Sequence, residues 1–218
     1  MQIDSRTDIV GLVDIQPTFM PGGELAVAQG DDIIPVVNRL LGLFDHAFAT
    51  QDWHPADHVS FASVHPGKRP YDTMDMPYGA QVLWPDHAVA GTPNAAIHTG
   101  IDQTRIEAII RKGFRRTLDS YSALFENDRR TPTGLEAWLR QRGFSRLFLC
   151  GLATDFCVAW SAEDAVRLGF TVTVIEDACR GIGLPEPGGR TTIDTARDRL
   201  TALGVRFIDS NELIRDRA

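Results

Sequence analysis

The sequence predicts an α/β protein, a three-layer α-β-α sandwich around a mostly parallel, Rossmann-like central sheet. Short apolar runs alternate with segments of helical periodicity along the chain, which is the pattern of βαβ units. The 218 residues, 43% of them hydrophobic, suffice for the core of one α/β domain and are few for two. We therefore expect a single domain over residues 1–218.

The strands are predicted from apolar runs of the length that a buried parallel sheet requires. The first, TDIVGLVDI, is almost entirely apolar between its two aspartates, and SRLFLCGL and FTVTVIED are similar runs further along the chain. In chain order, the six predicted strands cover residues 7–15, 46–51, 106–112, 145–152, 170–177 and 205–209.

The helices are predicted from amphipathic periodicity and from residues that begin or end a helix. Asp31 or Asp32 is expected to cap the first, and Pro35 is tolerated in its first turn. Gly143 and Gly204 follow two others, where glycine commonly ends a helix. In chain order, the predicted helices cover residues 31–44, 133–142, 154–169 and about 190–203.

Residues 52–103 show almost no periodicity and hold six of the twelve prolines. Unstructured connections of this length are uncommon in compact domains and are usually functional or disordered. The segment is rich in Trp, Tyr, Phe and His, which argues against disorder. We expect an interaction with a ligand or with the rest of the fold to hold it in place.

Four chemically complementary residues lie at or just beyond predicted strand ends: Asp14, Asp52, Lys112 and Cys157. Ligands of open parallel sheets bind beyond the carboxyl ends of the strands. With Thr154 as the helix N-cap, Cys157 lies in the first turn, where the helix dipole lowers a thiol pKa. Asp14 can then accept the thiol proton and Lys112 can orient Asp14.

Each of these residues also has a purely structural interpretation. Cys157 can be a small buried helix residue, Asp14 can cap a turn, and Lys112 can be a solvated strand end. Cys150 lies inside the apolar run LFLCGL and is predicted to be an inert core thiol, and Cys179 has no activating setting.

A metal site is predicted from QDWHPADH, in which Asp52 and His54 are two residues apart. In an extended chain such side chains lie on one side and can bind the same ion. His58 and His87 are alternatives for the third ligand. His65 and His98 are interpreted as solvated loop histidines that bind no metal.

In order along the chain, DIQPTFMPGGELAV, TQDWHPADHVSFA, VLWPDHAVAGTPNAAIH, RKG and GLATDFCV resemble the nicotinamidases among the isochorismatase-like cysteine hydrolases. The resemblance covers about residues 9–178. It implies a catalytic triad of Asp14, Lys112 and Cys157, and metal ligands Asp52, His54 and His87. It also implies an oxyanion hole from the N–H groups of Ala153 and Cys157, with a cis peptide between Leu152 and Ala153.

For substrate binding, the resemblance implies that Phe19 and Trp84 sandwich a pyridine ring, with Gln16, Leu152 and Ala153 nearby. Thr18 and Ala88 depart from the family pattern, which often has Asp and Cys at these positions. The implied reaction is hydrolysis of nicotinamide to nicotinate and ammonia through a cysteine thioester, in NAD salvage, with pyrazinamide as a further substrate. The implied cofactor is one divalent metal ion, with zinc preferred over iron or manganese.

Composition restricts the partners. Acidic residues outnumber basic ones by 29 to 22 and the basic residues are scattered, which disfavours nucleic acid. No apolar run approaches the roughly 18 residues of a membrane span. The absence of a secretory signal pattern and the odd number of cysteines predict a cytoplasmic protein. A homo-oligomer is left open.

Other interpretations of the function are a hydrolase of carbamoyl compounds, a zinc hydrolase with a structural Cys157, and a non-catalytic binding protein.

Overall fold

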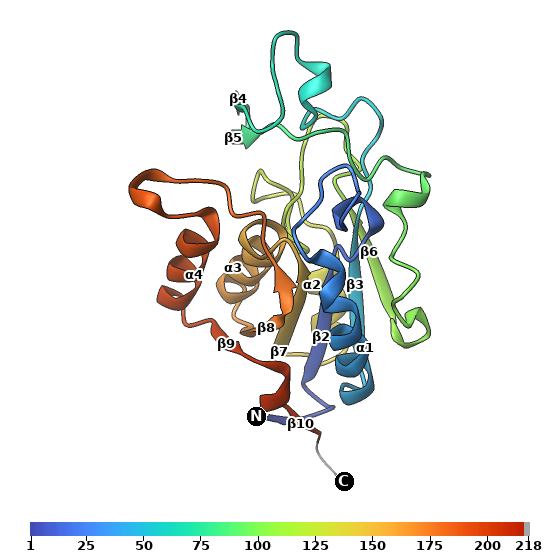
Figure 1. The fold of residues 1–218 in the computed structure, drawn as a ribbon. Helices are drawn as coiled ribbons and strands as arrows, with labels where there is room; N and C mark the ends of the chain where they lie inside the picture. The colour runs from blue at the N-terminus through green and yellow to red at the C-terminus, as the bar shows by residue number, and fades with distance from the viewer. Residues whose placement is uncertain (216–218) are drawn as a thin grey trace.

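The structure, a computed structural model that describes residues 1–215, is built on a six-stranded sheet in the order β6-β3-β2-β7-β8-β9 (Figure 1). All neighbouring strands of this sheet run parallel. This confirms the predicted fold class. The strands are β2 (Asp8–Val13), β3 (Ala47–Asp52), β6 (Ala108–Lys112), β7 (Arg146–Leu152), β8 (Thr171–Arg180) and β9 (Arg206–Ile208).

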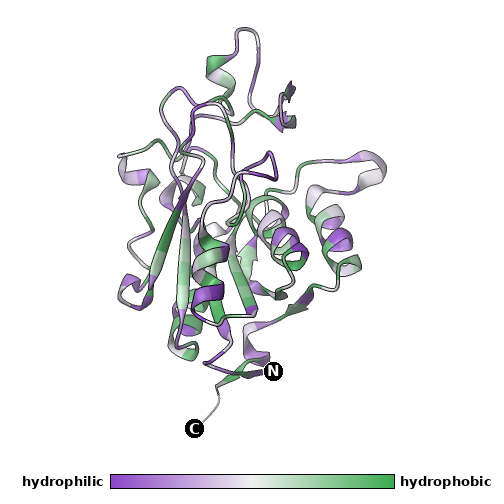
Figure 2. Ribbon diagram, turned by 180° about the vertical axis from the view of Figure 1, so that it is seen from behind, coloured by the Kyte–Doolittle hydropathy of each residue, from purple (hydrophilic) through white to green (hydrophobic). Residues whose placement is uncertain are grey.

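Four α-helices cover the sheet, α1 on one face and the other three on the opposite face (Figures 1 and 2). Hydrophobic colour is concentrated on the central strands, and the helices carry both colours (Figure 2). This is the expected result when each helix buries one apolar stripe against the sheet. The helices are α1 (Ile34–Leu43), α2 (Leu135–Gln141), α3 (Ala159–Arg167) and α4 (Thr192–Ala202).

The helix ends agree with the sequence prediction except at the starts of α1 and α3, and α3 begins at Ala159 after a π-helical turn, Thr154–Val158. A 3-10 turn over Gly30–Ile33 precedes this helix, so Ile33 is its N-cap and neither Asp31 nor Asp32 is. Pro35 does lie in the first turn. Gly143 and Gly204 both follow a helix with φ of +83°, the left-handed conformation that glycine adopts most easily.

Strand β8 is longer than predicted and contains Cys179, which was expected to follow the strand. The pairing of β7 with β8 shifts register between Leu149 and Gly151. The last residues of β8, Asp177 to Arg180, are not an apolar run, and hydropathy therefore gave no sign that the strand continues.

The long connection after β3 is folded back on itself. The Trp84 amide donates to Ser60 O and the Ala62 amide donates to Trp84 O, both at 2.8 Å. His54 exchanges similar bonds with the backbone on either side of Val89. The segment is thus a set of paired extended stretches, which places residues near 54 and near 87 side by side.

An antiparallel hairpin of β4 (Thr73–Met76) and β5 (Gly79–Val82) extends from this connection and was not predicted (Figure 1). Each strand has only four residues, and although β4 alternates exposed and half-buried positions, β5 (GAQV) has no apolar alternation by which a strand is recognised. A second unpredicted pair, β1 (Gln2–Ile3) with β10 (Ile214–Arg215), is too short to leave a pattern. Among residues 1–215, no helix combines the length and apolar character needed to cross a membrane.

Candidate active site

Asp14, Asp52, Lys112 and Cys157 meet at the carboxyl end of the sheet, as the strand-end argument predicted. Asp14 directly follows β2, and Asp52 and Lys112 are the last residues of β3 and β6, paired in register. Cys157 lies on the turn after β7. Since β2, β3, β6 and β7 are parallel neighbours, their ends place all four side chains on one edge.

Lys112 is fully buried between two carboxylates, which excludes its interpretation as a solvated strand end. Its Nζ lies 2.8 Å from Asp14 Oδ2, donates to Asp52 Oδ1, and lies 3.5 Å from Cys157 Sγ. Burial alone would lower the pKa of Lys112, but the two carboxylates outweigh it and hold that pKa well above its ordinary value. The side chain is therefore a permanent ammonium.

Asp14 is held by Thr50, a residue that the sequence did not single out. The Thr50 hydroxyl donates to Asp14 Oδ1 at 2.6 Å and accepts the Asp14 amide at 3.1 Å. Asp14 has φ of +49°, which is unusual for a residue with a side chain and is typical of functional sites. Burial raises the pKa of Asp14, which suits a group that must accept and return a proton.

Cys157 lies on a π-helical turn, Thr154–Val158, whose N-cap is Ala153 rather than Thr154. Its Sγ and a carboxylate oxygen of Asp14 are within 4.8 Å of each other. The expectation of a lowered thiol pKa is wrong: burial raises the pKa of Cys157 well above its ordinary value, and the nearby Lys112 ammonium only opposes this. The resting group is therefore a thiol and not a thiolate.

The other two cysteines are also buried thiols with raised pKa values. Cys150 is fully buried in β7, with its Sγ 3.6 Å from Gly11 O. Burial raises the pKa of Cys179 to about 12. Both are free thiols, in accord with the prediction that neither is activated.

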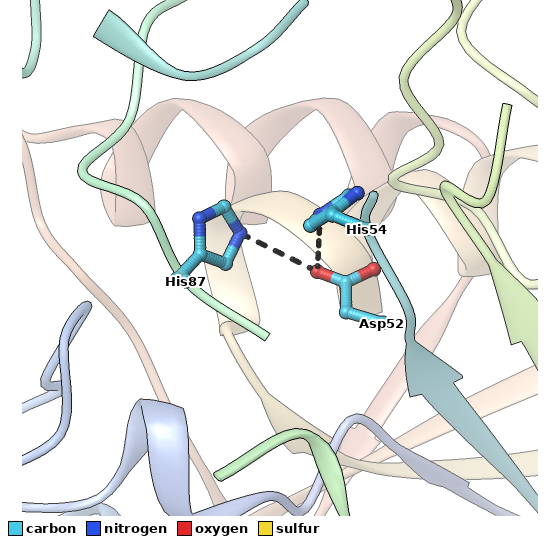
Figure 3. A group of neighbouring side chains, drawn as sticks. All are labelled: Asp52, His54 and His87. Atoms are coloured by element: carbon cyan, nitrogen blue, oxygen red, sulfur yellow. Dashed lines mark ion pairs between the residues drawn. The ribbon is translucent and has the colours of Figure 1, made fainter. Parts of the chain in front are cut away.

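His54 and His87 converge on one oxygen of Asp52 (Figure 3). Asp52 Oδ2 lies 3.5 Å from His54 Nε2 and 3.7 Å from His87 Nε2. The Nδ1 atoms lie 2.8 Å from Gly113 O and Pro85 O, an arrangement that puts each ring proton on Nδ1 and turns the Nε2 lone pair toward Asp52. His54 Nε2 is buried without a hydrogen-bond partner among the described residues.

One carboxylate and two imidazoles fit a divalent metal ion of the zinc, iron or manganese type. Their ligand atoms all lie within 4.8 Å of one another. The unpartnered His54 Nε2 supports this fit, because a buried polar atom normally has a partner.

His58, the alternative third ligand, packs against His54 with ring centroids 4.3 Å apart. Its Nδ1 lies 2.7 Å from Ser60 Oγ and its Nε2 lies 3.3 Å from Leu118 O. Burial, together with His54, lowers the pKa of His58 to about 4, so the ring is neutral at pH 7. Both ring nitrogens of His58 thus contact groups other than Asp52, whereas His87 Nε2 lies near the same Asp52 oxygen as His54 Nε2.

Cys157 from the first set and Asp52 and His87 from the second line one small pocket, together with Phe19, Trp84 and Ala153 among others. The Leu152–Ala153 peptide is cis, as the resemblance implied. Within residues 1–215, Gln16 and Leu152 do not line this cavity. Gln16 instead donates to Asp52 O at 2.9 Å and accepts the Asp52 amide at 2.8 Å, and Leu152 is buried in the core.

The chain is similar to known proteins over most of its length. The sequence profile of the isochorismatase domain matches residues 9–210. The chain belongs to the isochorismatase family. It is 48% identical over 203 residues to a nicotinamidase of Acinetobacter baylyi, covering 93% of this chain and 92% of that one.

Two solved structures of the family also match. A nicotinamidase and pyrazinamidase of Acinetobacter baumanii has a TM-score of 0.90 at 46% identity, covering 95% of this chain and 98% of that one. A pyrazinamidase of Pyrococcus horikoshii in complex with zinc has a TM-score of 0.73 at 31% identity, covering 93% of this chain and 98% of that one.

The two departures from the family pattern contact each other in this family member. The Ala88 amide donates to the Thr18 hydroxyl at 3.1 Å, and Thr18 is fully buried. Ala88 is next to His87, so this bond holds the backbone beside a residue of the candidate metal site.

The cavity walls include residues that the sequence analysis missed: Leu25, Asp119, Tyr121, Phe156 and Ile182. Tyr121 accepts hydrogen bonds from Trp84 Nε1 at 3.0 Å and from Gln81 Nε2 at 2.8 Å, and so orients the Trp84 ring. Asp119 to Tyr121 lie between predicted elements, where no periodicity drew attention. Ser120 is similarly placed, and its carbonyl accepts from Lys112 Nζ at 2.9 Å.

The carboxyl group of Glu126, further along this segment, is expected to make the stability of the folded protein depend on pH. Its Oε1 accepts from Arg115 Nη1 at 3.0 Å, and burial raises its pKa from 4.5 to about 7 against the opposing Arg115 charge. Because the folded-state pKa is raised, the stabilisation is complete below about pH 4.5 and is lost as the pH rises through about 7.

We expect Glu126→Gln to remove this loss. Between pH 5 and 8 the free energy of unfolding of the variant should fall less than that of the original protein, by about 1–2 kcal/mol. Urea unfolding at both pH values measures the difference. The same pH dependence in both proteins would contradict the assignment.

Proposed function

We propose that this chain hydrolyses nicotinamide to nicotinate and ammonia, and that pyrazinamide is a second substrate. The observation that carries the proposal is a single pocket lined by the thiol of Cys157 and by Asp52 and His87, with Asp14 beside the thiol and His54 beside Asp52. The names of the similar nicotinamidases and pyrazinamidases support the choice of substrate.

The reaction begins when Asp14 takes the proton of Cys157 and the thiolate attacks the carboxamide carbon. The N–H groups of Ala153 and Cys157 stabilise the tetrahedral oxyanion. Asp14 returns the proton to the amide nitrogen, the C–N bond breaks, and ammonia leaves a thioester on Cys157. Asp14 then removes a proton from water, whose oxygen attacks the thioester carbon. The C–S bond breaks, Asp14 returns its proton to the Cys157 sulfur, and the acid product ionises to nicotinate.

Lys112 keeps Asp14 and Asp52 in place throughout, since its ammonium contacts both carboxylates. Phe19 and Trp84 line the cavity and sandwich the pyridine ring, so that the carboxamide lies near Cys157. Asp52, His54 and His87 hold one divalent ion, with zinc preferred, which supplies a Lewis-acid site for the pyridine nitrogen. The zinc complex of the similar pyrazinamidase supports this preference.

We place the reaction in NAD salvage and in the cytoplasm, and the three free cysteines suit a reducing compartment. The catalytic unit is one domain over residues 1–218, in which the segment 52–103 is held in place by its contribution to the metal site.

An ammonia-release assay tests the proposal. We expect release from nicotinamide and pyrazinamide, loss of release after alkylation of Cys157, and little release from carbamoyl compounds. Release from carbamoyl compounds alone would favour a carbamoyl hydrolase. Activity that survives complete alkylation would favour hydrolysis by metal-bound water, and binding of nicotinamide without ammonia release would indicate a binding protein.

The metal ligands are tested by His54→Ala. Because a direct ligand is removed, metal affinity should fall by at least about 100-fold and nicotinamide binding should weaken. Elemental analysis and calorimetry measure the two effects. His65→Ala is the matched control, since that ring bonds to Val59 O outside the site. Metal loss with full activity retained would contradict the role of the ion in holding the pyridine ring.

A further inference from the structure

The turn that carries Cys157 also carries a buried carboxylate that the mechanism does not use. Asp155 is 5% exposed. Its Oδ1 accepts the Ile182 amide at 3.0 Å, and its Oδ2 accepts the Gly183 amide at 2.9 Å and the Thr192 hydroxyl. Residues 181–191, which connect β8 to α4, are called here the β8–α4 loop. The Asp155 carboxylate thus receives two hydrogen bonds from this loop and one from Thr192, the first residue of α4.

Other hydrogen bonds of the β8–α4 loop lie within the loop or join it to α4. The Glu186 amide donates to Arg190 O, and Leu184 and Thr192 exchange two bonds, all at 2.9 Å. Its residues are half-buried or exposed. The turn Thr154–Val158, which carries Cys157, is called here the catalytic turn. Hydrogen bonds to a charged, buried acceptor are among the stronger ones in proteins, so Asp155 binds the β8–α4 loop strongly to this turn.

The hydrogen bonds of Asp155 bear on the shape of the pocket because the β8–α4 loop and the catalytic turn both contribute residues that line it. Ile182, whose amide bonds to Asp155, lines the cavity, as do Phe156 and Cys157 from the catalytic turn. Asp155 itself is not among the cavity-lining residues, and its contacts are with the loop. It therefore acts through other residues and does not touch a reacting atom.

We propose that Asp155 is a positioning residue that holds the β8–α4 loop against the catalytic turn, so that Ile182 closes the cavity over the bound pyridine carboxamide. This role rests on the proposed function for its substrate. It explains a buried carboxylate beside the nucleophile that takes no part in proton transfer, and it makes residue 182 a determinant of substrate affinity.

Asp155→Asn is the direct test, because the amide keeps the shape but turns an NH₂ group toward one of the N–H or O–H donors. We expect KM for nicotinamide to rise about 10-fold while kcat changes less than about threefold. In the absence of substrate, N-ethylmaleimide should modify Cys157 about 10-fold faster, measured by mass spectrometry of the peptide that contains it. Ile182→Ala should reproduce both effects with Asp155 intact.

Asp198→Asn is the matched control. Asp198 bonds to Arg190 of the same loop at 2.6 Å, but its side chain is 71% exposed, so both readouts should stay at the original values. Thr192→Val removes the hydroxyl that donates to Asp155 and accepts the Leu184 amide, and it should shift both readouts in the same direction, by about two- to threefold.

If Asp155→Asn folds and its KM and alkylation rate are unchanged, the proposal is overturned. A fall in kcat alone would also overturn it. So would effects of Asp198→Asn on KM and alkylation rate as large as those of Asp155→Asn. If Asp155→Asn does not fold, original values of both readouts in Thr192→Val and Ile182→Ala would overturn it equally. The alkylation rate needs no turnover. If the original protein releases no ammonia from nicotinamide, the proposed function fails while the alkylation ratio still decides the role of Asp155.

Discussion

Replacement of Cys157 by alanine is expected to reduce ammonia release from nicotinamide by about 10⁴-fold or more, because the variant has no nucleophile to form the thioester. The side chain is small and the metal ligands are untouched. The melting temperature should therefore stay close to the original value, and the metal content should stay near one ion per chain. Steady-state kinetics, calorimetry and elemental analysis measure the three quantities.

Cys150→Ala provides the matched control, since the same atom is removed from a buried thiol seven residues away. Cys150 packs in β7 with its Sγ near Gly11 O, so the change should cost about 1 kcal/mol of stability and leave turnover within about threefold. Substantial turnover by Cys157→Ala, with metal bound, would favour the alternative in which a metal-bound water is the nucleophile.

Lys112→Met is expected to impair both stability and turnover. The ammonium lies between two buried carboxylates, and its removal leaves Asp14 and Asp52 without their shared counter-charge. Removing one partner of a buried charge pair typically costs about 3–5 kcal/mol. Turnover should also fall by at least about 100-fold, because Asp14 loses its orientation and the site loses a positive charge.

Arg111→Met is the corresponding control on the same strand. Arg111 is exposed, bonds to Gln51 Oε1 at 3.2 Å and lies over the Trp53 ring, so its loss should cost less than about 1 kcal/mol. Urea unfolding and kinetics of both variants give the comparison. An equally small cost for Lys112→Met would show that the two carboxylates do not depend on the ammonium.

Hydropathy located every strand of the main sheet because each contains a short group of apolar residues, even the two edge strands β6 and β9, which are only partly buried. It could not locate the β4–β5 hairpin, whose strands have only four residues each, or the end of β8, where Asp177 to Arg180 interrupt the apolar run. The N-cap of α1 was wrong for a related reason. Two adjacent aspartates both suit a helix start, and the choice of a 3-10 turn depends on how the preceding loop packs.

The sequence by itself determined the fold class and brought Asp14, Asp52, Lys112 and Cys157 to one edge, because parallel strand ends must share an edge. It could not determine the protonation of Cys157, since burial outweighs the helix position and is a property of the assembled core. Only the tertiary structure placed His87 rather than His58 beside Asp52 Oδ2, and Gln16 behind Asp52. It alone connected Asp155 to a loop some 27 residues further along the chain. These outcomes depend on contacts between distant segments, which no local pattern encodes.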